Sequence, residues 1–389
     1  MQVINDKLKV WATDLDQKTM QQARRTSRLP VVSGHVALMP DAHLGLGATI
    51  GSVVPTEGAV IPACVGVDIG CGMAAVRTDL IASDLPDDLA PLLRKIARVV
   101  PAGVGRGHDH RDWRTQRSAT GWLDDNRPRT ELSDRQEKKT YTQLGTLGSG
   151  NHFAEVSLDE DDRVWMVLHS GSRGIGNELA QSHIAEAKSV AKRLEIGLED
   201  PDLAFLLEGT DEFDHYIADL HFAQAYARVN RETMLDAALK ELFRSVGKGR
   251  ERDRVNCHHN YTEQETHFGR EVWVTRKGAI SARVGQLGII PGSMGTDTYI
   301  VEGLGNPDSY MSSAHGAGRR MSRTQARKTL SAQSLKQAMG DRTWLGDRAD
   351  KLVDEHPDAY KDINEVMRLS ADLVKVQHRL QAVLNYKGT

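Results

Sequence analysis

A carboxylate and a thiol lie three positions apart within residues 65–72, at Asp68 and Cys71, with glycines interleaved between them. Glycine lets the backbone turn tightly and approach a ligand closely, so both side chains can converge on one point. A thiolate and a carboxylate together suit a borderline divalent cation such as zinc, manganese or iron. The alternative is a buried strand that ends in a turn, with Cys71 as a small apolar filler.

Histidines elsewhere in the chain could complete such a site. His152 follows a glycine-rich stretch, and His169 ends a buried-strand pattern that runs into a Gly/Ser turn. A ligand or catalytic group is often carried on a loop at such a position. His258 and His259 are adjacent on an extended segment and therefore point to opposite faces, so at most one of them can face a given metal.

Three Gly/Ser loops, at residues 145–151, 289–296 and 312–319, indicate a second kind of site. The backbone N–H groups of such loops can bind an anion. One of these loops alone is a weak signal, but the three together indicate the walls of a nucleotide or phosphate pocket. The last of them contains His315.

Residues 39–47 carry Asp41 and His43 on alternating positions of an expected strand end. We expect these side chains to orient a metal ligand from outside the first coordination sphere. The alternative is a turn in which Asp41 caps its own backbone.

Composition sets limits on the function. The 389 residues carry a formal net charge of -3, so a nucleic-acid partner would have to bind a local basic patch. The three cysteines give no disulfide framework, and a reducing cytoplasm is the expected location. No apolar run approaches the length of a membrane span, so no membrane partner is expected.

The elements that must position these residues are short strands and longer helices. Strands are expected within residues 31–77 and at 164–168 and 271–275, and helices at 16–28, 88–99, 178–194, 214–246 and 362–383. Asp88 is the expected N-cap of its helix. Lys387 lies just past the expected terminal helix, and a lysine in such a position is usually exposed to solvent.

We therefore predict an α+β fold: a single compact domain over residues 1–389, with mixed β-sheets and peripheral helices. The alternating βα repeats of a doubly wound sheet are not evident. Residues 106–140 are expected to form a charged insertion or loop, in which Arg111, Arg114 and Arg117 are candidate phosphate contacts.

The loops together resemble those of the RtcB family of RNA-splicing ligases. The resemblance runs from about residue 36 to residue 387 and weakens across 106–140 and 195–210. It is carried by seven stretches in family order, at residues 39–47, 66–72, 145–153, 169–174, 256–261, 291–295 and 315–319. It implies an RtcB-like fold.

The resemblance also implies roles for individual residues. Two manganese ions would be held by Asp68, Cys71, His152, His169 and His259, with Cys71 bridging them. GTP would guanylylate His315, the implied catalytic residue. The pocket for GTP would be formed by Asn151, His152, Phe153, Ala154, Glu155, His259, Asn260, Pro291, Gly292, Ser293, Met294, Thr298, His315, Gly316, Ala317, Gly318 and Lys387. Glu155 and Lys387 would read the guanine edge.

The implied reaction joins an RNA 2′,3′-cyclic phosphate or 3′-phosphate end to a 5′-hydroxyl end. It passes through a GMP–histidine intermediate and an RNA end capped as 3′-ppG. RNA phosphates would contact Arg173, Arg276, Lys277, Arg319 and Arg323, because several cations near one site supply local charge that the net charge hides. A monomer is expected, and an archease-type activator assists some members of the family.

Two other functions fit part of the pattern. A metal-dependent phosphohydrolase would use Asp68, Cys71 and the histidines, but it leaves His315, the guanylate loops and Lys387 without a role. A non-catalytic GTP-binding RNA sensor would use the nucleotide loops, and it predicts binding of GTP without covalent capture.

Overall fold

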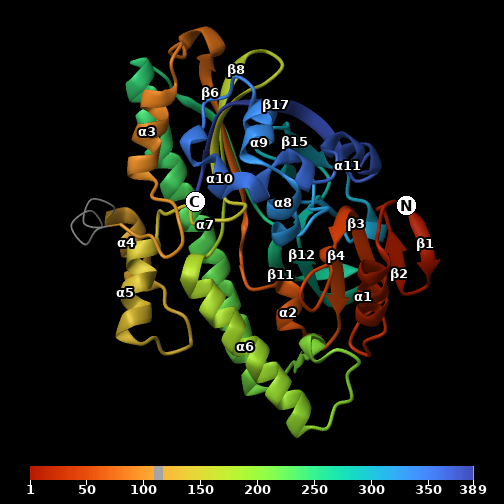
Figure 1. Ribbon diagram of the computed structural model, residues 1–389. Coiled ribbons are helices and arrows are strands. Elements are labelled where there is room, and N and C mark those ends of the chain that lie inside the picture. The colour runs from red at the N-terminus through yellow and green to blue at the C-terminus, as the bar shows by residue number, and fades with distance from the viewer. Residues whose placement is uncertain (109–116, 389) are drawn as a thin grey trace.

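Two large β-sheets form the centre of the molecule (Figure 1). The computed structural model describes residues 1–108 and 117–388. The first sheet has six strands in the order β1-β2-β3-β4-β12-β11, and only β2 and β3 pair in parallel. Its strands are β1 (Gln2–Asn5), β2 (Leu8–Val10), β3 (Val36–His43), β4 (Ile50–Thr56), β11 (Asn260–His267) and β12 (Arg270–Lys277).

The second sheet has seven strands in the order β10-β6-β8-β7-β17-β15-β14, and all its pairings are antiparallel. Its strands are β6 (Gly72–Ile81), β7 (Phe153–Leu158), β8 (Arg163–Ser170), β10 (Glu251–His258), β14 (Leu287–Pro291), β15 (Thr298–Gly303) and β17 (Val374–Lys387). Two small two-stranded sheets pair β13 (Ala279–Ser281) with β16 (Ser312–Ala314), and β5 (Ala59–Val60) with β9 (Leu206–Leu207).

Helices surround the sheets, with the long α6 and α7 beside α3, α4 and α5 on one flank and α1 on the other (Figure 1). Helix α7 begins where Thr210 accepts a hydrogen bond from the Phe213 N–H, and it ends at Gly247 in the left-handed conformation. The helices are α1 (Gln17–Ser27), α2 (Pro62–Val65), α3 (Ala90–Val99), α4 (Arg117–Asp125), α5 (Asp134–Gln143), α6 (Arg173–Arg193), α7 (Asp211–Val246), α8 (Arg323–Thr329), α9 (Ala332–Met339), α10 (Ala349–Leu352) and α11 (Ile363–Leu369).

The alternation of side chains along β6 shows how the layers pack. Met73 and Ala75 join the core between the two sheets, while Ala74 and Val76 join the core that the second sheet forms with α3 and α7. Both faces of β6 are therefore buried, as the apolar run at residues 73–76 requires. The chain has the α+β fold that the sequence predicted, and its description as one domain stays a prediction.

The expected helix over residues 362–383 is wrong. Only Ile363–Leu369 is helical, and residues 374–387 form β17, which lies between β7 and β15 near the middle of the second sheet. The apolar residues at helical spacing, up to Leu380, indicated a helix. Pairing of the segment with two strands outweighs that local preference, and Leu380, Leu384 and Tyr386 are buried in the sheet.

The described part of residues 106–140 is more helical than a loop would be. It contains α4 and most of α5, rather than a solvated loop. Apolar residues of this region, among them Leu123, pack against Ile175, Phe222 and Tyr226 of α6 and α7, so the stretch buries a face despite its charge. Arg111 and Arg114, the candidate phosphate contacts, lie outside the described residues, as does the side chain of Arg117.

The other four expected helices correspond to α1, α3, α6 and α7 within five residues at each end, and one expected cap differs. Helix α3 begins at Ala90 and the cap position is Leu89, not Asp88. Asp88 instead accepts a hydrogen bond from the Ala90 N–H, an Asx turn that precedes the first helical residue. Pro91 lies in the first turn, where its missing N–H is harmless.

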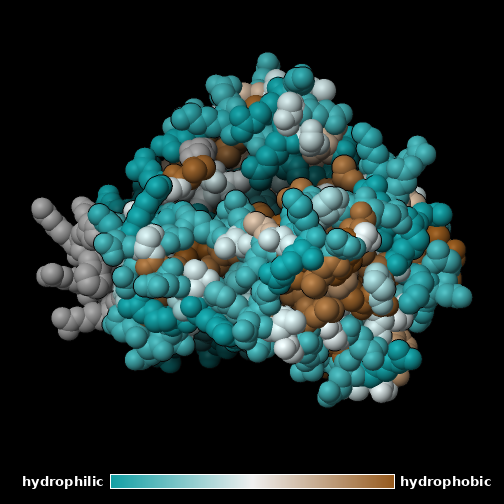
Figure 2. Space-filling model, turned by 90° about the horizontal axis from the view of Figure 1, so that it is seen from below, coloured by the Kyte–Doolittle hydropathy of each residue, from teal (hydrophilic) through white to brown (hydrophobic). Residues whose placement is uncertain are grey.

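The surface seen from below is mostly hydrophilic, and its largest group of hydrophobic residues lies right of centre, with smaller groups elsewhere (Figure 2). Within the described part of the chain, none of the helices combines the length and the apolar character that crossing a membrane requires.

Candidate functional site

The ends of three neighbouring strands bring the candidate metal ligands together. Cys71 immediately precedes β6 and His152 immediately precedes β7, while His169 lies near the end of β8 between them. In antiparallel neighbours, the start of one strand meets the end of the next. His259 follows β10, which pairs with β6, and its N–H donates to the Cys71 carbonyl at 2.8 Å.

Five side chains converge at this point. The Cys71 Sγ lies 3.4 Å from the Nε2 atoms of both His152 and His169. The His152 Nε2 lies 3.1 Å from Asp68 Oδ2, and the His169 Nε2 lies 2.9 Å from the His259 Nε2. The structure therefore places a thiol, a carboxylate and three imidazoles around one small volume, and all but Asp68 are buried.

The hydrogen bonds of His152 and His169 show that this set fits a cation. Their Nδ1 atoms lie 2.9 Å from the Leu147 carbonyl and 3.1 Å from the Asn151 carbonyl, so each Nδ1 carries the proton of a neutral ring. Each Nε2 then directs a lone pair at Cys71, and that of His152 also at Asp68. Lone pairs facing one another need a positive charge between them, and soft and imidazole ligands suit a transition metal.

The protonation states agree with this arrangement. Burial, together with neighbouring imidazoles, lowers the pKa of His169 and of His259 well below the usual range, so both rings are neutral. Burial raises the pKa of the Cys71 thiol well above its usual range, so a thiolate there needs a cation beside it. The role of the five side chains as metal ligands stays a prediction.

Replacing Cys71 with alanine is expected to weaken metal binding by more than about 100-fold, because it removes the ligand that contacts two of the histidines. Manganese retained after gel filtration, measured by atomic emission, checks the prediction. Cys64 is a matched control, since it is also buried but lies outside the cluster, and Cys64→Ala should retain the metal. Equal metal content in Cys71→Ala and wild type would contradict the assignment.

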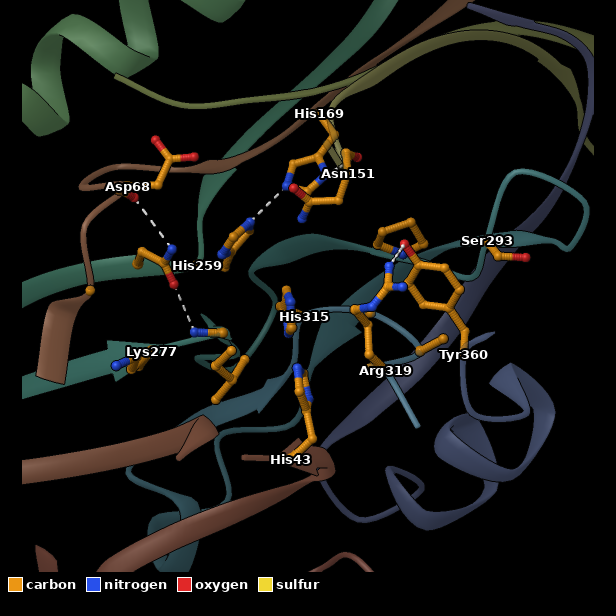
Figure 3. A pocket seen from close by; sticks show the side chains of 18 of the residues that line it. His43, Asp68, Asn151, His169, His259, Lys277, Ser293, His315, Arg319 and Tyr360 are labelled. Carbon is orange, nitrogen blue, oxygen red and sulfur yellow. Dashed lines mark hydrogen bonds between the residues drawn. The ribbon is translucent and has the colours of Figure 1, made fainter. Parts of the chain in front are cut away.

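A cavity of about 400 Å³ opens beside this cluster and has the size of a small-molecule site. His315 lies near its centre, with His259 on one side and Arg319 and His43 on the other (Figure 3). The His315 and His259 rings are 4.7 Å apart between centroids, so His315 is on the same side of the molecule as Cys71.

Most of the residues implied for GTP line this cavity. They are Asn151, Phe153, His259, Asn260, Pro291, Gly292, Ser293, Met294, His315, Gly316, Ala317, Gly318 and Lys387. Four others are not among its lining residues. His152 faces the cluster around Cys71, and Ala154, Glu155 and Thr298 are buried on β7 and β15.

Asp41 has a different partner from the one expected. Its Oδ2 lies 2.6 Å from the His315 Nδ1 and also accepts from the His315 N–H at 3.2 Å, so it orients His315 rather than a metal ligand. Its Oδ1 is buried without a hydrogen-bond partner among the described residues, which is a cost to folding. His43 contacts the Asp41 carbonyl, and burial lowers its pKa to about 4.

The carboxylate of Asp41 fixes the state of the His315 ring. Because Asp41 can only accept, the Nδ1 carries the proton and the Nε2 keeps its lone pair. An imidazole held in this tautomer beside a cavity is prepared for nucleophilic attack.

Two buried charged groups, Lys387 in the pocket wall and Glu355 beside it, form an ion pair. The Lys387 Nζ, on the last residue of β17, lies 3.0 Å from Glu355 Oε2 and 5.4 Å from the Phe153 ring centre. Glu355 also accepts from the Tyr360 hydroxyl at 2.6 Å. Lys387 is therefore not a solvated end: it is 4% exposed.

Glu155 lies on β7, opposite Asn385 of β17, whose amide donates to its Oε1 at 2.6 Å. Burial raises the pKa of Glu155 to about 7, although Asn385 and the charge of Lys387 lower it. An unfolded glutamate ionises near 4.5. The folded state therefore loses stability as the pH rises from about 4.5 to about 7, and the loss stays constant above that range.

Replacing Glu155 with glutamine is expected to remove this loss, because the amide keeps an acceptor for Asn385 and does not ionise. The free energy of unfolding of the variant, relative to wild type, should rise by an order of 3 kcal/mol between pH 4.5 and pH 8. Urea denaturation at a series of pH values measures it. A difference between the two proteins that does not change with pH would contradict the assignment.

The arginines and lysine expected to contact RNA fall into two groups. Lys277, Arg319 and Arg323 line the cavity. Arg173, half-buried, lies against the edge of the cluster, with its Nη1 3.4 Å from the His152 Nδ1. Arg276 is fully buried and donates to Glu265, the Ser312 hydroxyl and the Tyr310 carbonyl, so its expected contact with RNA is wrong.

Sequence reasoning also missed residues at this site. Tyr360 and Glu355 lie in a segment with no glycine-rich motif, and no local signal points to them. Asp41 did have a signal, since it alternates with His43, but nothing in the sequence indicated that its partner is His315.

The fold and the site define a class: an α+β protein with a buried Asp–Cys–His centre next to a glycine-lined pocket that contains a carboxylate-oriented histidine. The sequence matches the family described as "tRNA-splicing ligase RtcB" over residues 22–388. It is 44% identical to an RNA-splicing ligase RtcB of Escherichia coli (strain K12), over 99% of this chain and 98% of that protein.

More distant relatives match over similar lengths. The tRNA-splicing ligase RtcB of Nanoarchaeum equitans is 30% identical over 99% of this chain and 96% of its own length. The RNA-splicing ligase RtcB of Mycobacterium tuberculosis is 30% identical over 90% of this chain and 95% of its own length. The chain belongs to the RtcB family.

Proposed function

We propose that this protein is an RNA ligase that joins RNA 2′,3′-cyclic phosphate or 3′-phosphate ends to 5′-hydroxyl ends, using GTP and manganese. The observation that carries the proposal is the position of His315, oriented by Asp41, in a cavity next to the Asp68–Cys71–histidine cluster. Membership of the RtcB family and the names of the relatives support it.

The five clustered side chains are proposed to hold two manganese ions. Bound there, the ions would neutralise phosphate charge and grip a phosphoryl group from two sides. The tautomers of His152 and His169 direct their lone pairs toward such ions.

His315 is proposed to act first on GTP. Its Nε2 attacks the α-phosphorus, a nitrogen–phosphorus bond forms, the bond to the bridging oxygen breaks, and pyrophosphate leaves. Asp41 holds the Nδ1 proton throughout and stabilises the positive charge that develops on the ring. Glu155 and Lys387 are the proposed readers of the guanine edge.

The guanylate then passes from His315 to the RNA. An oxygen of a 3′-phosphate, formed by hydrolysis where the end is cyclic, attacks the guanylate phosphorus, and the bond to His315 breaks. The 5′-hydroxyl oxygen attacks the 3′-phosphorus and loses its proton, and GMP leaves as the phosphodiester forms. Arg173, Lys277, Arg319 and Arg323 are the proposed contacts of the RNA phosphates.

The same proposal includes an archease-type activator, which rests on the family resemblance, a cytoplasmic location, which rests on the cysteine pattern, and a monomeric state. Transfer of the guanylate from GTP to the protein, and from the protein to RNA, is tested by incubating the protein with manganese and α-labelled GTP. Acid-labile label should appear on the protein, move to an RNA with a 3′-phosphate, and be released as GMP when a 5′-hydroxyl RNA is added.

The alternatives give other results in the same experiment. A phosphohydrolase would release phosphate without labelling the protein, and a GTP-binding RNA sensor would bind GTP without covalent capture. Either result would overturn the proposal.

A further inference from the structure

A second cluster of metal-ligating side chains lies away from the cavity, between helices α6 and α7. His183 projects from α6, while His215 and Asp219 lie one turn apart on α7. Thr130, from the connection between α4 and α5, completes the cluster. In Figure 1, α4 and α5 lie beside these two long helices.

The ligand atoms share one small volume. The Asp219 Oδ2 lies 2.8 Å from the His183 Nε2 and 3.6 Å from the His215 Nε2. The Thr130 Oγ1 lies 2.5 Å from Asp219 Oδ2 and 3.0 Å from the His215 Nε2. Ligand atoms of a tetrahedral zinc ion, with bonds of about 2.0–2.1 Å, lie about 3.3 Å apart. Small side-chain shifts would therefore admit an ion.

The His183 ring has carboxylates at both nitrogens. Its Nδ1 lies 3.1 Å from Glu186 Oε2, and its Nε2 faces Asp219. A neutral imidazole carries one proton, so the second contact needs another positive charge, either a second proton or a metal ion. With a metal ion at the Nε2, the Nδ1–H would donate its hydrogen bond to Glu186, as it does to a carboxylate behind many metal-bound histidines.

The cluster around Cys71 has the same arrangement. There too, an acceptor fixes the Nδ1 proton of His152 while the Nε2 faces a carboxylate, at 3.1 Å. Asp219 and His183 are nearly fully buried, and His215 is 34% exposed, which gives an ion a route from solvent. Two imidazoles, a carboxylate and a hydroxyl form a ligand set that suits zinc better than a hard cation.

We propose that His183, His215 and Asp219 bind one Zn²⁺ ion, with the Thr130 hydroxyl or a water molecule as the fourth ligand. The ion would tie the connection between α4 and α5 to α6 and α7. This site does not depend on the proposed ligase function, and its test needs no RNA or GTP.

In the experiment, the full chain is treated with a chelator, dialysed against Zn²⁺ and then dialysed against buffer. Bound zinc is measured by elemental mass spectrometry. Wild type is compared with His215→Ala and His215→Gln. Glutamine keeps a side chain that can hydrogen-bond to Thr130 but is a poor zinc ligand. His221→Ala is the matched control, since His221 is exposed on the same helix and outside the cluster.

Both His215 variants should bind one equivalent of zinc less than wild type and His221→Ala, and zinc should raise their unfolding temperature less. Circular dichroism measures whether the variants are folded. If His215→Ala does not fold, the comparison is made with His215→Gln. Equal zinc content in wild type and folded His215→Gln would overturn the proposal and leave a cluster held by hydrogen bonds alone.

Discussion

Replacing His315 with alanine is expected to abolish covalent capture of GTP and RNA joining together. The Nε2 of His315 is the only atom assigned to bond the α-phosphorus, and alanine offers no nucleophile. The rate of label transfer from α-labelled GTP should fall below about 10⁻⁴ of the wild-type rate. Binding of GTP itself should remain measurable by equilibrium dialysis, because the other residues that line the cavity are unchanged.

The matched control for this variant is His221→Ala, which removes an exposed histidine of α7 and should keep the wild-type rate. Ligation of an RNA that already carries a 3′-ppG end provides a second measurement. That step does not use the histidine nucleophile, so His315→Ala should still perform it. Label on the His315→Ala protein would show that another residue is guanylylated.

Replacing Asp41 with asparagine is expected to slow guanylylation about 10²- to 10⁴-fold with little change in the affinity for GTP. The amide can donate to the His315 Nδ1, which then carries the lone pair and leaves the proton on Nε2, the wrong atom for attack. Asp41 is a positioning residue, so its loss should lower the rate constant for label transfer, not the concentration of GTP at half-saturation.

A structural role for Asp41 would give a different result. Asparagine has nearly the same volume as aspartate, and the buried Oδ1 already lacks a partner among residues 1–108 and 117–388, so folding should survive. Asp88→Asn, on the exposed turn before α3, is the control for the loss of one negative charge. Parallel losses of GTP affinity and of rate in Asp41→Asn would argue against positioning.

The loops of the site could be predicted from the sequence, and the reason is local. Glycine lets the backbone turn tightly wherever it occurs, so the glycines around Asp68 and Cys71, and the Gly/Ser turn after His169, indicated a ligand site without knowledge of the fold. The pairing of Asp41 with His315 could not be predicted in this way. The two residues are 274 positions apart, and only the arrangement of β3 and β16 in space brings them together.

Errors in the predicted elements have a common physical origin. Apolar spacing at residues 362–383 fits a helix, yet the segment gains more by pairing with two strands. Arg276 was assigned to RNA from its charge alone, although its strand position gives it buried partners in Glu265 and Ser312. In both cases, contacts between residues far apart in sequence decide the structure, and local sequence patterns do not indicate those contacts.

The position of β17 has a consequence for biosynthesis. The ribosome makes residues 374–387 after the rest of the sheet. Until then β7 and β15 lack β17, the strand that pairs with both, and each has an unpaired edge. Lys387, the last residue of that strand, completes the pocket wall beside Phe153. A nascent chain therefore completes this cavity only once β17 has joined the sheet, and ribosome-bound fragments that stop short of the strand should lack the GTP capture proposed above.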